Sequence, residues 1–225
     1  MIKIENLNKK FGNQQVLTNL NLNIEAGKVY GFVGANGAGK TTLFKCIAGF
    51  ENFEGKVEFI EGFSKNNIGF LPTTPPFISK ITGWEYLKLA TKARKIERSD
   101  FNAQNLFDLP LDKYPENYST GMKKKLALQG ILMQQNELFI LDEPFNGVDL
   151  QSNMVIKEII NSLKQKGKTL MIPSHIFSTL SELCDEILFL KNNRQIEKFE
   201  PNAYDELEKQ IRSITIDDKL KDFKF

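Results

Sequence analysis

A glycine-rich stretch constrains this chain more than any other feature: residues 34–42 read GANGAGKTT. The stretch follows an apolar run at 29–33 and precedes a helix-like segment at 43–48. A strand, a glycine loop and a helix in this order form a phosphate-binding P-loop. The glycines allow successive backbone N–H groups to surround an anion, and the helix adds the positive end of its dipole. The stretch therefore predicts a nucleotide-binding site.

The polar residues of this stretch have individual expected roles. The Lys40 ammonium is placed to reach the β- and γ-phosphates, and the Thr41 hydroxyl is placed to hold Mg²⁺. The other residues expected around the phosphates are Gly34, Asn36, Gly37, Ala38, Gly39 and Thr42. The alternative is a glycine-rich turn without a ligand, but the flanking strand and helix patterns favour nucleotide binding.

Length and composition narrow the class of protein. The 225 residues are 41% hydrophobic and 26% charged, which suits one large α/β domain or one domain with an embedded subdomain. A net charge of +2 gives no reason to expect a nucleic-acid partner. Cys46 and Cys184 stand alone in apolar surroundings and suggest reduced core residues in a cytosolic setting. No apolar run approaches the roughly 18 residues that a spanning helix needs.

Hydrophobic patterning predicts the order of the elements. Alternation at 2–7 and 20–24 predicts half-buried antiparallel strands. A helical insert is expected at 82–114, with helical spacing at 84–89 and again at 101–107. The remaining expected strands are 56–60, 67–71, 138–141, 169–172 and 187–190, and the remaining expected helices are 122–133, 154–163, 176–183 and 203–211.

Two carboxylates follow the most apolar of these strands, because residues 138–143 read LFILDE. The carboxyl end of a buried parallel strand is the edge where α/β sheets bind ligands. At this edge Asp142 can hold Mg²⁺ through water, and Glu143 can act as a general base on an attacking water. By itself, such a pair of carboxylates is as consistent with a solvated strand end as with a catalytic site. Because it lies downstream of a P-loop, it favours a site that hydrolyses a nucleotide.

Together with these motifs, the sequence resembles the ATP-binding subunits of ABC transporters over roughly residues 1–195. The resemblance places Phe11 where the family has an aromatic ring that stacks on adenine; the alternative is a core phenylalanine. It places His175, in the PSH sequence at 173–175, where the family has its switch histidine. His175 is the only histidine of the chain, and the alternative is a purely structural role.

Two further motifs of the family lie in the middle of the chain. Residues 118–123, YSTGMK, match the signature loop, in which Ser119 and the backbone near Gly121 would meet the γ-phosphate bound by the opposite subunit. Thr120 stands where the family usually has glycine, and the alternative is a helix cap with a basic face. Residues 146–149, NGVD, resemble the loop through which two subunits communicate.

One departure concerns the metal site. The family has a glutamine that contacts Mg²⁺ after the strand at 67–71, and this chain has Thr73. The threonine hydroxyl can still form a hydrogen bond, but it is shorter than a glutamine side chain and is expected to act through a bridging water. The expected metal ligands are thus Thr41, Asp142 and, through water, Thr73.

The resemblance implies an α/β P-loop NTPase fold: a RecA-like lobe with a mostly parallel sheet, an antiparallel β edge and a helical insert subdomain. We expect an ATPase domain over residues 1–200, with its insert at about 75–118, and a C-terminal extension at 201–225.

The function implied is binding and hydrolysis of ATP, with Mg²⁺, by a subunit that powers transport through a separate transmembrane permease. Glu143, His175 and Lys40 are the expected catalytic residues. Two subunits, as a homodimer or a pseudo-symmetric heterodimer, would close around ATP at the cytoplasmic face of a membrane. The alternatives are a soluble ABC ATPase without a transport role and a small-molecule kinase, although a kinase has no need of a signature loop.

Overall fold

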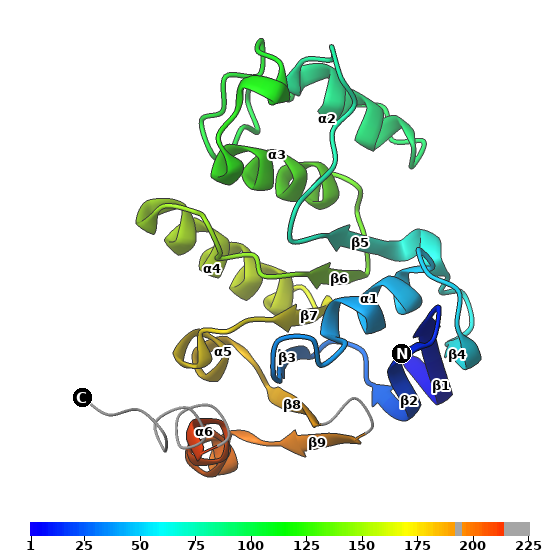
Figure 1. The fold of residues 1–225 in the computed structure, drawn as a ribbon. Coiled ribbons are helices and arrows are strands. Elements are labelled where there is room, and N and C mark those ends of the chain that lie inside the picture. Colours follow the sequence, from blue (N-terminus) through cyan, green and yellow to red (C-terminus); the bar gives the residue numbers. More distant parts are fainter. Residues whose placement is uncertain (192–194, 214–225) are drawn as a thin grey trace.

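The computed structural model describes residues 1–191 and 195–213, which form two β-sheets with helices packed on them (Figure 1). The larger sheet has the strand order β5-β6-β7-β3-β8-β9. Every neighbouring pair in it is parallel except β8–β9, which is antiparallel. Its strands are β3 (Val29–Val33), β5 (Ile68–Leu71), β6 (Leu138–Leu141), β7 (Thr169–Pro173), β8 (Glu186–Lys191) and β9 (Gln195–Phe199).

The smaller sheet is antiparallel, with the order β2-β1-β4. Its strands are β1 (Ile2–Phe11), β2 (Gln14–Ile24) and β4 (Glu54–Phe59). Alternate residues of β1 and β2 are buried, which is the pattern of a sheet with one face on the core. This sheet is the antiparallel β edge expected from the sequence.

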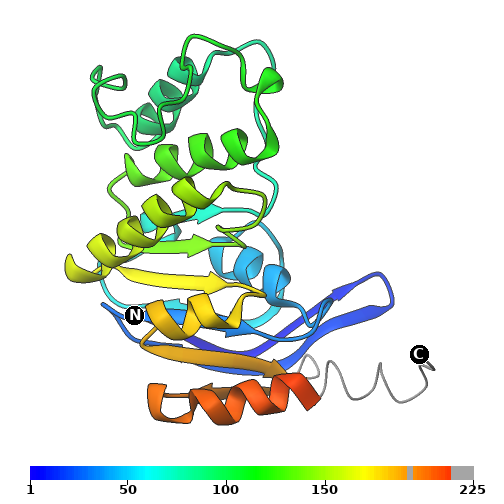
Figure 2. The ribbon, with the colours of Figure 1, turned by 90° about the vertical axis from the view of Figure 1, so that its left-hand side faces the viewer.

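Helices cover both faces of the larger sheet. On one face α1 packs together with the smaller sheet, and on the other face lie α3, α4, α5 and α6; Figure 2 views the sheet from the side of α4 and α5. The helix bounds are α1 (Lys40–Ala48), α2 (Gly83–Lys92), α3 (Thr120–Leu132), α4 (Leu150–Gln165), α5 (Phe177–Leu183) and α6 (Tyr204–Arg212). The predicted α/β class, with a mostly parallel sheet, is confirmed.

Strand β3 shows how the two faces are filled. All five of its residues are buried. Val29 and Val33 belong to the cluster beneath α3 to α6, whereas Tyr30 and Phe32 belong to the cluster that includes α1. The strand therefore has apolar contacts on both faces, and it holds the start of the glycine-rich loop at a fixed place on the sheet edge.

The helical insert is only partly as predicted. Helix α2 begins after Thr82, whose hydroxyl accepts a hydrogen bond from Glu85 N, while the Glu85 carboxylate accepts one from Thr82 N. The second expected helix, at 101–107, is wrong, because these residues form turns.

Local polar chemistry explains that error. The Asn105 side chain accepts a hydrogen bond from Leu109 N and donates one to Leu109 O, so it replaces helical backbone partners. Asp108 has a left-handed φ of 50°, and Pro110 lies two residues further along the chain. Phe101, fully buried, fills the small core under α2 without needing a helix.

Helix α6 packs on the main core. Tyr204 and Leu207 of α6 are buried in the same cluster as β8, and the Tyr204 hydroxyl donates a hydrogen bond to Cys184 O. The helix expected at 203–211 is therefore present. Residues 214–225 of the expected C-terminal extension lie outside the described residues. Within the described part of the chain, no helix has the length and apolar character needed to cross a membrane.

Gly31 sets the distance between β3 and α5. A Cβ at this position would lie 3.0 Å from Cys184 Sγ and 3.2 Å from Ile187 Cγ1. We therefore expect Gly31→Ala to lower the free energy of unfolding by about 1–3 kcal/mol, as overpacking does in other cores. The measurement is equilibrium unfolding in urea.

A double variant tests this reason. Cys184→Ala removes the crowding sulfur, so the double variant Gly31→Ala/Cys184→Ala should lose less stability than the two single variants added together. Additive losses would show that the contact between residues 31 and 184 is not the source of the destabilisation.

Candidate functional site

The glycine-rich loop joins the end of β3 to the start of α1, and its backbone conformation requires glycine. Gly34, Gly37 and Gly39 have φ values of 155°, 80° and 97°. A Cβ on Gly39 would lie 2.6 Å from Leu17 Cδ2 of β2, so the loop packs directly on the smaller sheet. The loop is thus built as the sequence predicted, with the N-terminus of a nine-residue helix at its end.

Lys40 lies over this loop. Its side chain donates hydrogen bonds to Gly34 O at 2.7 Å and to Ala35 O at 3.3 Å. Lys40 is 8% exposed, and this burial lowers the pKa of its ammonium, while the Glu143 and Asp142 carboxylates act against the shift. The ammonium is therefore held within the loop and close to the two carboxylates that follow β6.

The other residues of the glycine-rich loop are partly buried and partly exposed to solvent. Ala38 is buried and its N–H donates to Ala35 O at 3.1 Å, which closes a turn. Asn36 and Gly37 are exposed at the turn, and Thr42 is half-buried in the first turn of α1. The structure thus places all of the predicted phosphate-binding residues in one continuous loop and helix start.

Asp142 connects this loop to the larger sheet. It follows β6, is 1% exposed, and its N–H donates to Leu71 O of β5 at 2.8 Å. One carboxylate oxygen, Oδ2, accepts hydrogen bonds from the Thr41 hydroxyl at 2.9 Å and from the Thr73 hydroxyl at 2.8 Å. The three residues expected at the metal site, which lie far apart in the sequence, therefore meet at a single oxygen atom.

Glu143 and His175 form a pair beside Asp142. The His175 Nε2 atom lies 3.3 Å from Glu143 Oε1, and the histidine side chain is about half exposed. Glu143 has a left-handed φ of 54°, which is rare for a residue other than glycine, asparagine or aspartate. Burial raises the pKa of Glu143, although the nearby His175 and Lys40 oppose the rise. A carboxylate with a raised pKa next to a histidine is suited to accept a proton.

Lys124 also belongs to this region, although it was not predicted from the sequence. It lies in α3, is 2% exposed, and its ammonium donates to Glu143 O at 2.7 Å and to Asn146 O at 2.8 Å. Lys124 is the middle one of three consecutive lysines, which suggested a solvated basic face. The signal that could have found it is its helical phase, because Leu128 and Ile131 follow it at four and seven residues and are buried.

The signature loop leads into α3, whereas the phosphate-binding loop leads into α1. Ser119 is exposed and caps α3, with its hydroxyl accepting a hydrogen bond from Met122 N at 3.2 Å. Gly121 packs on the loop after β6, since a Cβ there would lie 2.6 Å from Gly147 O. Thr120 is the departure from the family pattern. The loop has room for its side chain, because the Thr120 Cγ2 atom would lie 4.0 Å from a Cβ built on Gly147.

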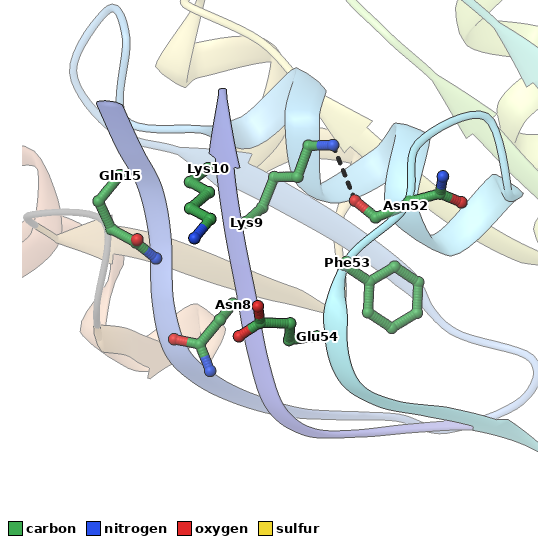
Figure 3. Close-up of a pocket in the computed structure, with 7 residues that line it drawn as sticks. All are labelled: Asn8, Lys9, Lys10, Gln15, Asn52, Phe53 and Glu54. Carbon is green, nitrogen blue, oxygen red and sulfur yellow. Dashed lines mark hydrogen bonds between the residues drawn. The ribbon is translucent and has the colours of Figure 1, made fainter. Parts of the chain in front are cut away.

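Phe11 ends β1 and is 46% exposed. The Lys9 ammonium lies 4.5 Å from the centre of its ring and is anchored by Glu51 and by Asn52 O. A hollow of about 380 Å³ lies beside this strand and contains no residue of the phosphate-binding loop (Figure 3). Its lining residues are Asn8, Lys9, Lys10, Gln15, Asn52, Phe53 and Glu54.

Comparison with known proteins decides the family. A protein-family model described as ABC transporter matches residues 17–146. The chain is 34% identical to the lantibiotic transport ATP-binding protein SrtF of Streptococcus pyogenes, over 98% of this chain and 100% of that protein. The chain belongs to the ABC transporter family. It is also 33% identical to the bacitracin transport ATP-binding protein BcrA of Bacillus licheniformis, over 94% of this chain and 72% of that protein.

Solved structures agree with this family. The ATP-binding subunit of an ABC transporter superposes with a TM-score of 0.82 at 26% identity, over 94% of this chain and 93% of the other. A dimeric ATP-binding cassette with ADP and Pi bound after hydrolysis has the same fold, with a TM-score of 0.79 at 21% identity, over 89% and 99% of the two chains. This ABC chain is an ATP-binding subunit with ATPase function, of the kind that powers transport.

Proposed function

We propose that Glu143 is the general base with which this ABC subunit hydrolyses ATP in the presence of Mg²⁺. The observation that carries the proposal is the convergence of Thr41 and Thr73 on one oxygen of Asp142, with the Glu143–His175 pair on the next residue. The Lys40 ammonium is hydrogen-bonded to Gly34 O, within the loop that would surround the phosphates. Charges and donors are thus arranged around the place where the γ-phosphate is expected.

The donor set fits a magnesium ion. Mg²⁺ prefers oxygen ligands and commonly takes only one or two from protein, the rest coming from phosphates and water. Thr41 and Asp142 supply a hydroxyl and a carboxylate that already touch, and the Thr73 hydroxyl stabilises the same carboxylate. When bound, the ion neutralises developing phosphate charge. Thr41 and Asp142 would hold it, and Thr73 would act through Asp142 or a bridging water.

The remaining residues position the nucleotide and the attacking water. Glu143 can take a proton from that water because burial raises the pKa of its carboxyl. The exposed His175 imidazole, 3.3 Å from Glu143, can hold the water or the γ-phosphate. The half-exposed Phe11 ring offers a stacking surface for adenine, and Lys9 restrains it from one side.

We further propose an ATP-dependent dimer, either of two copies or with a second ATPase subunit. Ser119 is exposed at the start of α3, where its hydroxyl and the helix N-terminus can meet the nucleotide of the opposite subunit. In support, the superposed ATP-binding cassette with ADP and Pi is itself dimeric. In this arrangement each hydrolytic site is completed by the partner's signature loop.

The names of two relatives support a proposal for the transported class and the membrane partner. SrtF and BcrA are named for transport of a lantibiotic and of bacitracin. We propose that this chain serves a transporter of peptide antibiotics and docks on its permease at the cytoplasmic side of the membrane. The docking surface proposed is the segment 73–78 with α2, where Ile78 is 56% and Leu89 48% exposed.

The general-base role predicts the behaviour of Glu143→Gln. The glutamine keeps the size of the side chain but cannot accept the proton, so ATP turnover should fall by about 10²–10⁴-fold while ATP binding is retained. The unhydrolysed ATP should then hold two subunits together. Size-exclusion chromatography should show a dimer with ATP and a monomer with ADP.

Glu137→Gln is the matched control, because Glu137 precedes the same strand at its opposite end and its side chain is half exposed. It should retain normal turnover. A Glu143→Gln protein that binds ATP and hydrolyses it at the normal rate would refute the assignment of the base.

The Asp142 contacts predict a modest role for Thr73. Thr73→Val removes the hydroxyl and keeps the shape of the side chain. Because Asp142 keeps its hydrogen bond to Thr41, ATP turnover should fall by less than about tenfold. Loss of a directly acting group would lower turnover by about 10²–10³-fold. Thr41→Val should show that larger loss, and Thr73→Ser should resemble the unaltered protein. Phosphate release is measured while Mg²⁺ is titrated. A hundredfold loss in Thr73→Val that high Mg²⁺ restores would make Thr73 a direct ligand.

The docking surface predicts the effect of a charge at Ile78. Affinity purification from detergent-solubilised membranes of the natural host should recover a membrane protein with this chain. Ile78→Glu should reduce that recovery severalfold, since it places a carboxylate in an apolar contact. Ile60→Glu is the control, because Ile60 is similarly exposed, at 53%, and follows β4 on the other sheet. Equal recovery with both variants would move the docking site elsewhere.

A further inference from the structure

Lys124 is a buried ammonium that none of the steps above uses. It is 2% exposed, although lysine is rarely buried to this degree unless it is paired. Its side chain crosses from α3 to the loop after β6 and donates to the carbonyls of Glu143 and Asn146. A buried charge is tolerated only when such partners are in place. The position of the ammonium and the position of the two carbonyls are therefore coupled.

The carbonyl that Lys124 holds belongs to the residue that has the strained backbone. Glu143 has a φ of 54°, and its carbonyl also accepts a hydrogen bond from Asn146 N at 3.2 Å. On the other side, Glu143 N donates to Pro173 O of β7 at 3.3 Å. The main chain of Glu143 is thus held at both ends. Since φ and ψ set where a side chain points, these bonds direct the carboxylate toward His175.

Burial lowers the pKa of the Lys124 ammonium, and the nearby carboxylates of Glu143 and Asp142 oppose this shift. The ammonium therefore lies near both carboxylates as well as bonding to the backbone carbonyl of Glu143.

Helix α3 touches the loop a second time. Gly121, in its first turn, approaches Gly147 O so closely that a Cβ would lie 2.6 Å away. The helix that presents Ser119 at its N-terminus is therefore attached to the loop at both Gly147 and Glu143. A shift of this helix is transmitted to the Glu143 backbone through the ammonium.

We propose that Lys124 is a positioning residue for Glu143, which ties the helix of the signature loop to the hydrolytic carboxylate of the same chain. This inference rests on the proposed function, in which Glu143 is the general base. A helix that moves when the partner's nucleotide binds at Ser119 would then adjust the base in its own subunit. The link would make hydrolysis in one site depend on occupancy of the other.

The test compares Lys124→Met with Lys124→Gln. Methionine has a similar length and donates nothing, whereas the glutamine amide can still donate to one of the two carbonyls. The number of ATP-binding sites in each preparation is determined first by nucleotide titration, so that partly unfolded protein does not count as slow enzyme. Turnover per binding site and the Kd for ATP are then measured for the full-length protein.

We expect Lys124→Met to lower turnover per site by about 10–100-fold, because a small misplacement of a catalytic group has an effect of this order. The Kd for ATP should change by less than about threefold. Lys124→Gln should fall between Lys124→Met and the unaltered protein. Lys28→Met is the control, because Lys28 forms ion pairs with Glu25 and Glu186 before the start of β3, away from the loop, and it should keep turnover per site within about twofold.

The outcomes distinguish a failure of the positioning role of Lys124 from a failure of the general-base role of Glu143. Unchanged turnover per site in Lys124→Met, or equal losses in turnover and ATP affinity, would overturn the positioning role. If Lys124→Met gives no folded protein, Lys124→Gln decides: a loss of at least about threefold per site supports the role, and no loss overturns it. Glu143→Gln is measured in parallel, and normal hydrolysis by that variant would instead overturn the general base itself.

Discussion

The structure around the nucleotide depends on one carboxylate oxygen, Oδ2 of Asp142. It accepts hydroxyl hydrogen bonds from Thr41 at the start of α1 and from Thr73 after β5. These contacts join three chain segments that have no covalent connection near the site. Charge-assisted hydrogen bonds of this kind are stronger than neutral ones, and they gain further strength in a buried setting such as that of Asp142, which is 1% exposed. The larger sheet fixes the position of Asp142, because the residue follows the fully buried strand β6.

Strain and burial are concentrated in the residues that follow Asp142. Glu143 has a left-handed backbone, its carboxyl has a pKa raised by burial, and a buried ammonium lies behind it. Each feature is unfavourable alone, and each persists only because neighbouring hydrogen bonds compensate for it. Such local conflicts with the rules of stable folding are expected where a site is shaped for chemistry rather than stability.

The features that could be predicted from the sequence are those with a local pattern. The loop at 34–42 needs only its own glycines and its flanking strand and helix, and the LFILDE run needs only an apolar strand with a polar end. The turns at 101–107 were predicted wrongly because apolar spacing outweighed the turn chemistry of asparagine and aspartate. Strand β9, an edge strand with little apolar character, was not predicted. Lys124 could not be recognised because charge suggested solvent, and only tertiary packing decides which lysine of three is buried.

The strand order has a consequence for the width of the site. Strand β3, which leads into the loop with Lys40, and strand β6, which leads to Asp142, are not neighbours, because β7 lies between them. With neighbouring strands about 4.8 Å apart, the ends of β3 and β6 are about 10 Å apart, and the end of β7 lies between them. His175 follows that end of β7 and lies beside Glu143. Had β3 and β6 been adjacent, the lysine and the aspartate could have neutralised one another, and the chain would have closed its own site with an internal ion pair.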